Sequence, residues 1–220
     1  MNSTVLSKIY PAPPFCEKEI LRYAGCRENG TEVSALLKEC LAEAGDSFSY
    51  KVCYRKLSAE ICGDICDFGL FKVQSQNLAL NLKGCGRVIL FAATVGVSPD
   101  RLVAKYTRLS QSKAIFFQAI GTERIEALCD IFCADISAEY GVGLKPRFSA
   151  GYGDLPLDVQ RDVFAILEPE KRIGLTLNQS LLMSPTKSVT AFVGIGGEKQ
   201  ENFNKCSGCD MTDCAFRGVL

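Results

Sequence analysis

The segment RFSAGYGDLP, residues 147–156, combines residue types that could hold a small charged ligand. The guanidinium of Arg147 can bind a carboxylate through two parallel hydrogen bonds, Gly151 lets a ligand approach the backbone, and Tyr152 offers a flat aromatic face with a polar tip. Together these groups suit an amino acid joined to an aromatic base. The same composition is also typical of a tight loop between two elements, because glycine and proline are frequent in loops.

A carboxylate upstream of this segment could complete such a site. Glu126 lies on a predicted helix whose apolar face includes Ile125, and its side chain could hold the ammonium group of the ligand. A solvated helix charge explains the same residue. Histidine is absent, which excludes a Ser-His-Asp hydrolase or a histidine-zinc enzyme. Any chemistry must therefore use carboxylates, thiols, the backbone or a bound cofactor.

Three cysteines near the C-terminus have the spacing of a soft-metal site. Cys206, Cys209 and Cys214 form a Cys-x2-Cys-x4-Cys run in a polar, glycine-bearing segment. Thiolates so close together are good ligands for zinc or for an iron-sulfur cluster, although both usually need a fourth ligand, such as Cys16 or Cys62. Two alternatives stay open for these cysteines: an exposed cluster of redox-active thiols, and no functional role.

Composition limits the class of protein. The chain has 220 residues, with 25 lysines and arginines against 25 aspartates and glutamates, so no overall field attracts nucleic acid. The N-terminal segment lacks the apolar run of a signal peptide, and no apolar run is long enough to span a membrane. We therefore expect a cytoplasmic protein whose 12 cysteines are reduced thiols. Cys40, Cys129 and Cys133 fall on apolar helix faces and are expected in the core.

The N-terminal half is predicted to mix helices and strands. Helices are expected over residues 20–24 and from Val33 onward, followed by a strand over residues 48–54 that alternates apolar and polar side chains. A second strand over residues 70–73 is expected to pair with it. A short helix around residues 78–82 then leads to the buried strand RVILFAATVG.

The C-terminal half is likewise predicted to mix helices and strands. Helical segments are predicted around residues 102–106, around 116–117, over 125–136 with Thr122 as N-cap, and over 159–167, before two short strands, IGLTL and SVTAFVGI. Because these elements do not alternate regularly, we predict an α+β fold, with helices packed on a twisted mixed or antiparallel sheet. Residues 1–200 are assigned to this domain, and residues 201–220 to a cysteine-rich tail.

Three segments follow one another along the chain: GTERIEALCD (residues 121–130), PRFSAGYGDLPLDVQRDVFAIL (146–167) and KRIGLTLNQSLLMSPTKSVTAF (171–192). Their order resembles the activation domain of vitamin B12-dependent methionine synthase, which binds S-adenosylmethionine. In that family an arginine begins R-P-x-P-G-Y, a proline and a helix follow, and then comes L-T-x-S-x-A-M-x-P-x-x-S-V-S-G. The matching positions are Arg147, Gly151, Tyr152, Pro156, Leu175, Thr176, Ser180, Met183, Pro185, Ser188 and Val189. The resemblance is clear over residues 120–195 and weak before them. Phe148 and Ala150 replace the family prolines, and Asp158 and Arg161 replace a following His-x-x-Lys.

The resemblance implies a set of binding residues. S-adenosylmethionine would contact Arg147, the backbone around Ser149 and Gly151, and the ring of Tyr152, while Glu126 would take its amino group. No catalytic residue is implied, because the work of such a domain is mainly to position the methyl group.

The resemblance also implies a function. The protein would be the reactivation component of a cobalamin-dependent methionine synthase or a related corrinoid methyltransferase, and would supply the methyl group when cob(II)alamin is reduced by a flavodoxin or ferredoxin. The cobalamin would be held by the partner. Two alternatives stay open: a metal-bearing corrinoid-activating or electron-transfer protein that depends on the cysteine tail, and a non-catalytic S-adenosylmethionine sensor.

Overall fold

The computed structural model describes residues 4–26 and 30–196 of the chain. The predicted boundary at residue 200 and the tail of residues 201–220 lie outside the described residues. Within the described part, no helix combines the length and the apolar character needed to cross a bilayer.

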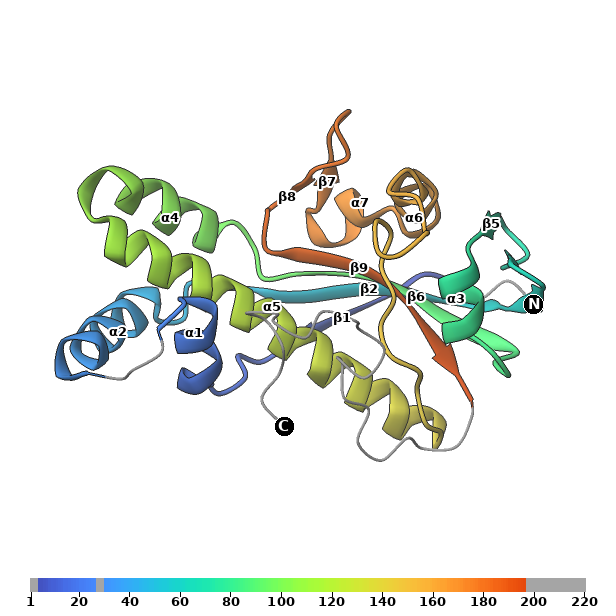
Figure 1. Ribbon diagram of the computed structural model, residues 1–220, viewed down its shortest axis with the longest axis horizontal. Helices are drawn as coiled ribbons and strands as arrows, with labels where there is room; N and C mark the ends of the chain where they lie inside the picture. Colours follow the sequence, from blue (N-terminus) through green and yellow to red (C-terminus); the bar gives the residue numbers. More distant parts are fainter. Residues whose placement is uncertain (1–3, 27–29, 197–220) are drawn as a thin grey trace.

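A four-stranded antiparallel sheet forms the centre of the molecule (Figure 1). Its order is β1 (Leu6–Tyr10), β2 (Tyr50–Ser58), β6 (Arg87–Thr94) and β9 (Ser188–Ile195). Every pairing in it is antiparallel, which decides between the two kinds of sheet that the sequence left open. Strand β6 is apolar at nearly every position because both of its faces are buried.

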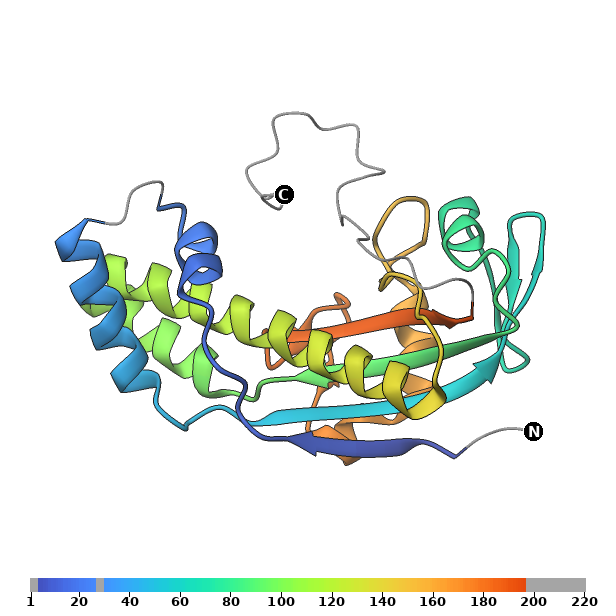
Figure 2. The ribbon, with the colours of Figure 1, turned by 90° about the horizontal axis from the view of Figure 1, so that it is seen from below.

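One face of the sheet is covered by four helices: α1 (Glu17–Tyr23), α2 (Thr31–Ala44), α4 (Ser98–Leu109) and α5 (Gln111–Tyr140). Figure 2 shows α5 running along the sheet, with the other three gathered around its first half. The side chains of Val52, Ile89 and Val193 point into this layer and meet apolar residues of α5 such as Phe132. Phe132 also contacts the ring of Phe91, with the ring centroids 4.9 Å apart.

The opposite face carries smaller elements. They are α3 (Gln76–Asn81), α6 (Val159–Leu167), α7 (Pro169–Ile173), a three-stranded sheet of β3 (Glu60–Cys62), β4 (Ile65–Asp67) and β5 (Lys72–Gln74), and the hairpin of β7 (Thr176–Leu177) and β8 (Met183–Ser184). Leu90 and Phe192, which are register partners on β6 and β9, anchor this second core.

Several elements differ from the predictions. The strand predicted over residues 70–73 pairs with β4 rather than with β2, so that pairing was wrong. The two helices predicted around residues 116–117 and 125–136 are one helix, α5. Thr122 is not an N-cap, because its hydroxyl donates to the carbonyl of Gln118 within that helix (2.9 Å), and Ser110 caps the helix instead. The elements that were not predicted are β1, β3, β4, β8 and α7.

Gly121 allows the segment before β9 to approach α5 closely. A Cβ atom at this position would lie 3.0 Å from both Lys187 Cγ and Pro99 Cβ. Lys187 is buried here and its ammonium donates to the hydroxyl of Thr122 (2.8 Å). Burial lowers the pKa of Lys187. This contact joins the start of β9 to the middle of α5.

A buried ion pair on α5 holds the chain that leads into α1. Arg124 is completely buried and its guanidinium donates to Glu123 and to the carbonyls of Pro13 and Pro14. Glu123 in turn accepts a hydrogen bond from the backbone N–H of Cys16 (3.2 Å). The guanidinium therefore supplies the donor that the carbonyl of the buried Pro13 needs, and it also bonds the carbonyl of the exposed Pro14.

We expect Arg124→Ala to lower the free energy of unfolding by about 3–5 kcal/mol, because it leaves the Glu123 carboxylate buried and uncompensated. Urea unfolding followed by circular dichroism measures this change. The matched control is Lys171→Ala, which removes an exposed pair with Glu168 and should have little effect. Equal stability of the two variants would show that the buried pair does not hold the N-terminal segment.

Candidate ligand-binding site

The structure brings Arg147 and Glu126 into direct contact. Arg147 Nη2 donates to Glu126 Oε2 at 2.7 Å, and its Nη1 donates to Asp130 Oδ1 at 2.5 Å. Glu126 and Asp130 lie one helical turn apart on α5, so one guanidinium bridges two carboxylates of the same helix face. Asp130 was not predicted as a site residue, although its spacing of four residues from Glu126 is a signal that could have identified it.

The cluster of Arg147, Glu126 and Asp130, called the Arg147 cluster below, is partly shielded from solvent. The side chain of Arg147 is 17% exposed, whereas that of Asp130 is 60% exposed. Burial opposes the charge of Arg147, but the negative charges of Asp130 and Glu126 outweigh it, and the pKa of Arg147 is raised above its usual value. Burial also raises the pKa of Cys129, so this thiol packs beside Arg147 as a neutral group.

Helix α1 contributes a tyrosine to the surroundings of Glu126. The pKa of Tyr23 is raised by burial first and then by the negative charge of Glu126. The ring of Tyr23 also carries the guanidinium of Arg22 at 4.2 Å from its centroid. The hydrogen bonds of the buried Arg124 to the segment before α1 therefore help to position this ring, because they hold the start of the helix that carries it.

Strand β9 fixes the position of Arg147. The next residue, Phe148, pairs with Phe192, and each backbone N–H donates to the other's carbonyl at 3.0 and 2.8 Å. The side chain of Phe148 packs on the second core, where Ala150 is also buried. The two positions that hold prolines in the resembling family therefore carry core residues in this chain.

The loop turns sharply after Ser149. The N–H of Tyr152 donates to the carbonyl of Ser149 (3.2 Å), and the N–H of Gly151 donates to that of Leu155 (2.9 Å). Gly151 has a φ of +88°, which favours glycine, and a Cβ there would lie 3.1 Å from Leu157 Cδ1. This turn leaves the side chain of Tyr152 69% exposed. Ser149, Gly151 and Tyr152 thus share one loop with Arg147.

Asp154 attaches the same loop to the first turn of α3. Its carboxylate accepts hydrogen bonds from the hydroxyl of Ser75 (2.5 Å) and from the backbone N–H groups of Gln76 (2.6 Å) and Asn77 (3.2 Å). These bonds, with that from Ser75 the strongest, lower the pKa of Asp154. In return, the N–H of Asp154 donates to Asn77 Oδ1 (3.2 Å). Sequence reasoning missed this role because the partners lie far apart in the chain.

Other predicted features lie away from this cluster. Asp158 and Arg161, which replace the family His-x-x-Lys, are exposed and form a surface ion pair of 3.6 Å. Cys206, Cys209 and Cys214 lie outside the described residues. In residues 4–26 and 30–196, no three histidine, cysteine or acidic side chains are grouped as a metal site would require. Of the cysteines suggested as a fourth ligand, Cys16 and Cys62 are both exposed.

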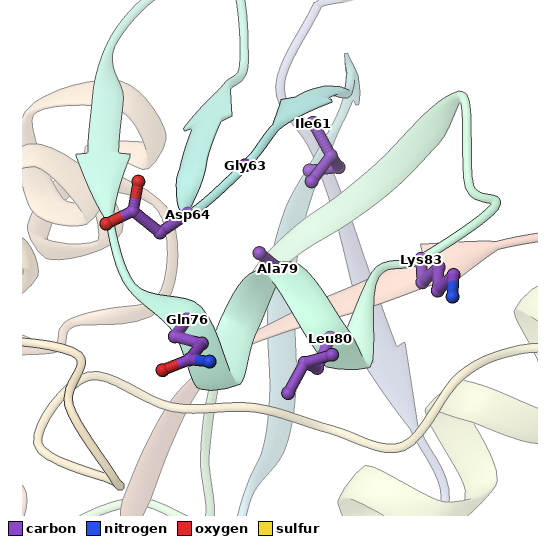
Figure 3. A pocket seen from close by; sticks show the side chains of 7 residues that line it. All are labelled: Ile61, Gly63, Asp64, Gln76, Ala79, Leu80 and Lys83. Carbon is purple, nitrogen blue, oxygen red and sulfur yellow. The ribbon is translucent and has the colours of Figure 1, made fainter.

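A surface pocket of about 590 Å³ lies beside α3 and contains none of the predicted ligand contacts (Figure 3). Its walls come from the β3–β4 hairpin and from α3: Ile61, Gly63, Asp64, Gln76, Ala79, Leu80 and Lys83. Asp64 is already engaged by the side chain of Gln74 (2.8 Å). We therefore place the candidate site at the Arg147 cluster rather than at this pocket.

Comparison with known proteins establishes the fold. No family model and no curated protein matches the chain. Among solved structures, it is similar to a crystal structure of the MetH reactivation domain bound to AdoHcy, with a TM-score of 0.66 and 13% sequence identity, over 91% of this chain and 80% of that chain. The protein is therefore an α+β protein with an antiparallel sheet. Its fold is that of the MetH reactivation domain, which confirms at the level of fold the resemblance predicted from the sequence.

We expect Asp154→Ala to loosen the 149–155 loop, because the variant loses three hydrogen bonds to the start of α3. The backbone N–H groups of Gly151 and Leu155, which are bonded inside the loop, should then exchange with solvent deuterium about tenfold faster. Hydrogen exchange followed by mass spectrometry reads this directly. Asp158→Ala, an exposed aspartate that makes no bond to α3, is the control. Unchanged exchange in Asp154→Ala would mean that the loop is held by β9 alone.

Proposed function

We propose that this protein binds S-adenosylmethionine at the Arg147 cluster and supplies its methyl group for the reductive reactivation of cob(II)alamin in a partner protein. The observation that carries the proposal is the 2.7 Å contact between Arg147 and Glu126. These are the two charges that the resemblance assigned to the ligand's amino-acid end, and they meet from separate elements. The fold shared with a reactivation domain that binds AdoHcy supports the same ligand class.

The internal ion pair has the charges that an amino acid needs. An α-amino acid carries a carboxylate and an ammonium group on one carbon atom. Inserted between the two side chains, it would place its carboxylate on Arg147 and its ammonium on Glu126, so each charge of the protein exchanges one partner for another. Little net ion-pairing is lost in such an exchange. Asp130 can keep its bond to Nη1 throughout, which holds the guanidinium plane in position.

The neighbouring loop suits the rest of the ligand. Tyr152 is exposed on the loop that begins at Arg147 and can stack on a purine ring. The turn at Gly151 brings the backbone to the surface without a side chain in the way. Ser149 and Gly151 are therefore assigned to backbone contacts with the ligand, and Tyr152 to an aromatic contact.

Methyl transfer at this site needs no acid or base from the protein. The acceptor would be a cobalamin held by the partner, a methionine synthase or related corrinoid protein, after its one-electron reduction by a cytoplasmic reductant such as flavodoxin or ferredoxin, and loss of the methyl group would convert the sulfonium to a thioether. The chain's own residues bind and orient the donor. A protein without histidine can perform this task.

We also propose that Cys206, Cys209 and Cys214 bind zinc or an iron-sulfur cluster. The support is their spacing, together with the exposure of Cys16 and Cys62, either of which is open to act as a fourth thiolate. A sulfur-ligated cluster in this position would give the protein a second role in electron transfer to the partner.

The binding proposal is tested by calorimetric titration with S-adenosylmethionine. We expect Arg147→Ala to weaken binding by about 1.5–3 kcal/mol, the scale of a charge-assisted hydrogen bond, and Arg147→Lys to restore part of it. Glu126→Gln should also weaken binding while it keeps the shape of the side chain. Arg161→Ala removes an exposed cation elsewhere and serves as the control. Absence of binding by the parent protein at millimolar ligand would defeat the proposal.

The metal proposal is tested by elemental analysis of protein purified without oxygen. We expect zinc or iron in the parent chain and its loss when all three cysteines are changed to serine. Affinity for S-adenosylmethionine should be almost unchanged in that variant, because Glu126, Arg147 and Tyr152 all lie upstream. An equal and negligible metal content in the parent and the variant would show that the three cysteines do not bind a metal.

A further inference from the structure

We propose that Lys187 is a further ligand contact of this site and that it recognises the ribose hydroxyl groups of S-adenosylmethionine. The inference rests on the proposed function, because it extends the same site beyond the amino-acid end of the ligand. The structural observation is a buried lysine that no carboxylate bonds in the described part of the chain. Its ammonium donates to the hydroxyl of Thr122 at 2.8 Å.

A buried ammonium without an ion pair is unfavourable. The carboxylate whose charge acts on Lys187 is that of Asp100, and both of its oxygens are already bonded. One accepts the backbone N–H of Thr186 (2.9 Å) and the other accepts the hydroxyl of the same residue (2.5 Å). Burial therefore lowers the pKa of Lys187 in spite of Asp100. A cation kept under these conditions indicates a ligand group that accepts hydrogen bonds from it.

The ammonium of Lys187 emerges from the core beside Thr122. The stem of the lysine is buried across Gly121, where a Cβ atom would lie 3.0 Å from Lys187 Cγ and 3.1 Å from Lys187 Cε. Thr122 itself is half-buried, and its hydroxyl donates to the carbonyl of Gln118 (2.9 Å). That hydroxyl therefore turns a lone pair toward the lysine, and it holds the ammonium near the surface while the stem stays covered.

The ammonium lies on the same face of α5 as the Arg147 cluster. Thr122, Glu126 and Asp130 follow one another at intervals of four residues, so their side chains form one row along the helix. Lys187 is attached to the first member of this row and Arg147 to the other two. The two cations are therefore separated by about one helical turn, and Glu126 lies between their attachment points.

The loop that carries the other predicted contacts leads toward Lys187. Two antiparallel bridges, of Leu144 with Ile195 and of Phe148 with Phe192, pair the segment around Arg147 with β9. Because the pairing is antiparallel, the chain after Arg147 runs toward the start of β9. Lys187 directly precedes that strand. A ligand that extends from Arg147 in the direction of this loop therefore extends toward Lys187.

The dimensions of the ligand fit this arrangement. Five bonds join the α-carbon of S-adenosylmethionine to the ribose ring, a span of about 6 Å, close to one helical turn. With its amino-acid end at Arg147 and Glu126, the ligand would place the ribose beside Thr122. An ammonium has three N–H donors, and the bond to Thr122 uses one of them. The other two suit a pair of neighbouring hydroxyl groups.

The experiment is calorimetric titration of the full chain with S-adenosylmethionine and with the analogue whose ribose lacks both hydroxyl groups. We expect Lys187→Met to weaken binding of S-adenosylmethionine by about tenfold, the loss of hydrogen bonds from a charged donor, and to leave binding of the analogue unchanged. Thr122→Val releases the ammonium and should weaken binding of S-adenosylmethionine alone by about threefold. The ratio of the two dissociation constants is the readout.

Thermal unfolding separates this role from a structural one. Methionine has a similar shape and removes an unpaired buried charge, so the melting temperature of Lys187→Met should be no lower than that of the parent. The control is Lys105→Met, which removes an exposed cation from α4 and should leave the ratio unchanged. The parent's ratio in both Lys187→Met and Thr122→Val overturns the inference. Failure of the parent to bind S-adenosylmethionine overturns the proposed function itself, so the two failures are distinguishable.

Discussion

The packing of α5 along the antiparallel sheet is the constraint on which the site depends. The apolar stripe of this helix is buried between the sheet and the neighbouring helices, so its register decides which of its charged side chains enter the core. Glu123 and Arg124 are buried and neutralise each other, together with the carbonyls of the proline-rich segment. Glu126 and Asp130 face the edge of the sheet instead, and there they meet a cation from another element.

That cation is placed by backbone pairing, not by its own side chain. The bridge between Phe148 and Phe192 extends the sheet by a short stretch beyond β9, and it fixes the residue before it, Arg147, beside α5. A register shift of one residue would exchange the faces of Arg147 and Phe148, which would bury a guanidinium in the second core. The apolar side chain of Phe148 therefore specifies the position of the charged one. At its other end the loop is tied to α3 by Asp154, so its two ends are attached to different parts of the fold.

The charges of the site are arranged for exchange rather than for permanence. An ion pair between two side chains near the protein surface, such as that of Arg147 and Glu126, contributes little to the free energy of folding, since solvent and salt screen it. The same pair keeps a guanidinium and a carboxylate at the spacing that a zwitterionic ligand can use, with the guanidinium oriented by Asp130. A site of this kind recognises and positions its ligand without proton transfer, which suits a chain that has no histidine.

The periodicity of apolar residues was sufficient to predict α2, α6, β2, β6 and β9 as helices or strands. Each of these elements buries enough side chains on one or both faces to show its period in the sequence. Periodicity was insufficient for β1, β3, β4, β8 and α7, since elements of a few residues are stable only against the partners that the fold supplies. For the site, the residue types of Arg147, Glu126 and Tyr152 indicated a charged aromatic ligand. Only the tertiary structure decided that Arg147 and Glu126 touch, that Asp130 shares the contact and that Asp154 holds the loop. These are contacts between distant segments, and they depend on how α5, β9 and α3 pack together, which no local pattern of residues encodes.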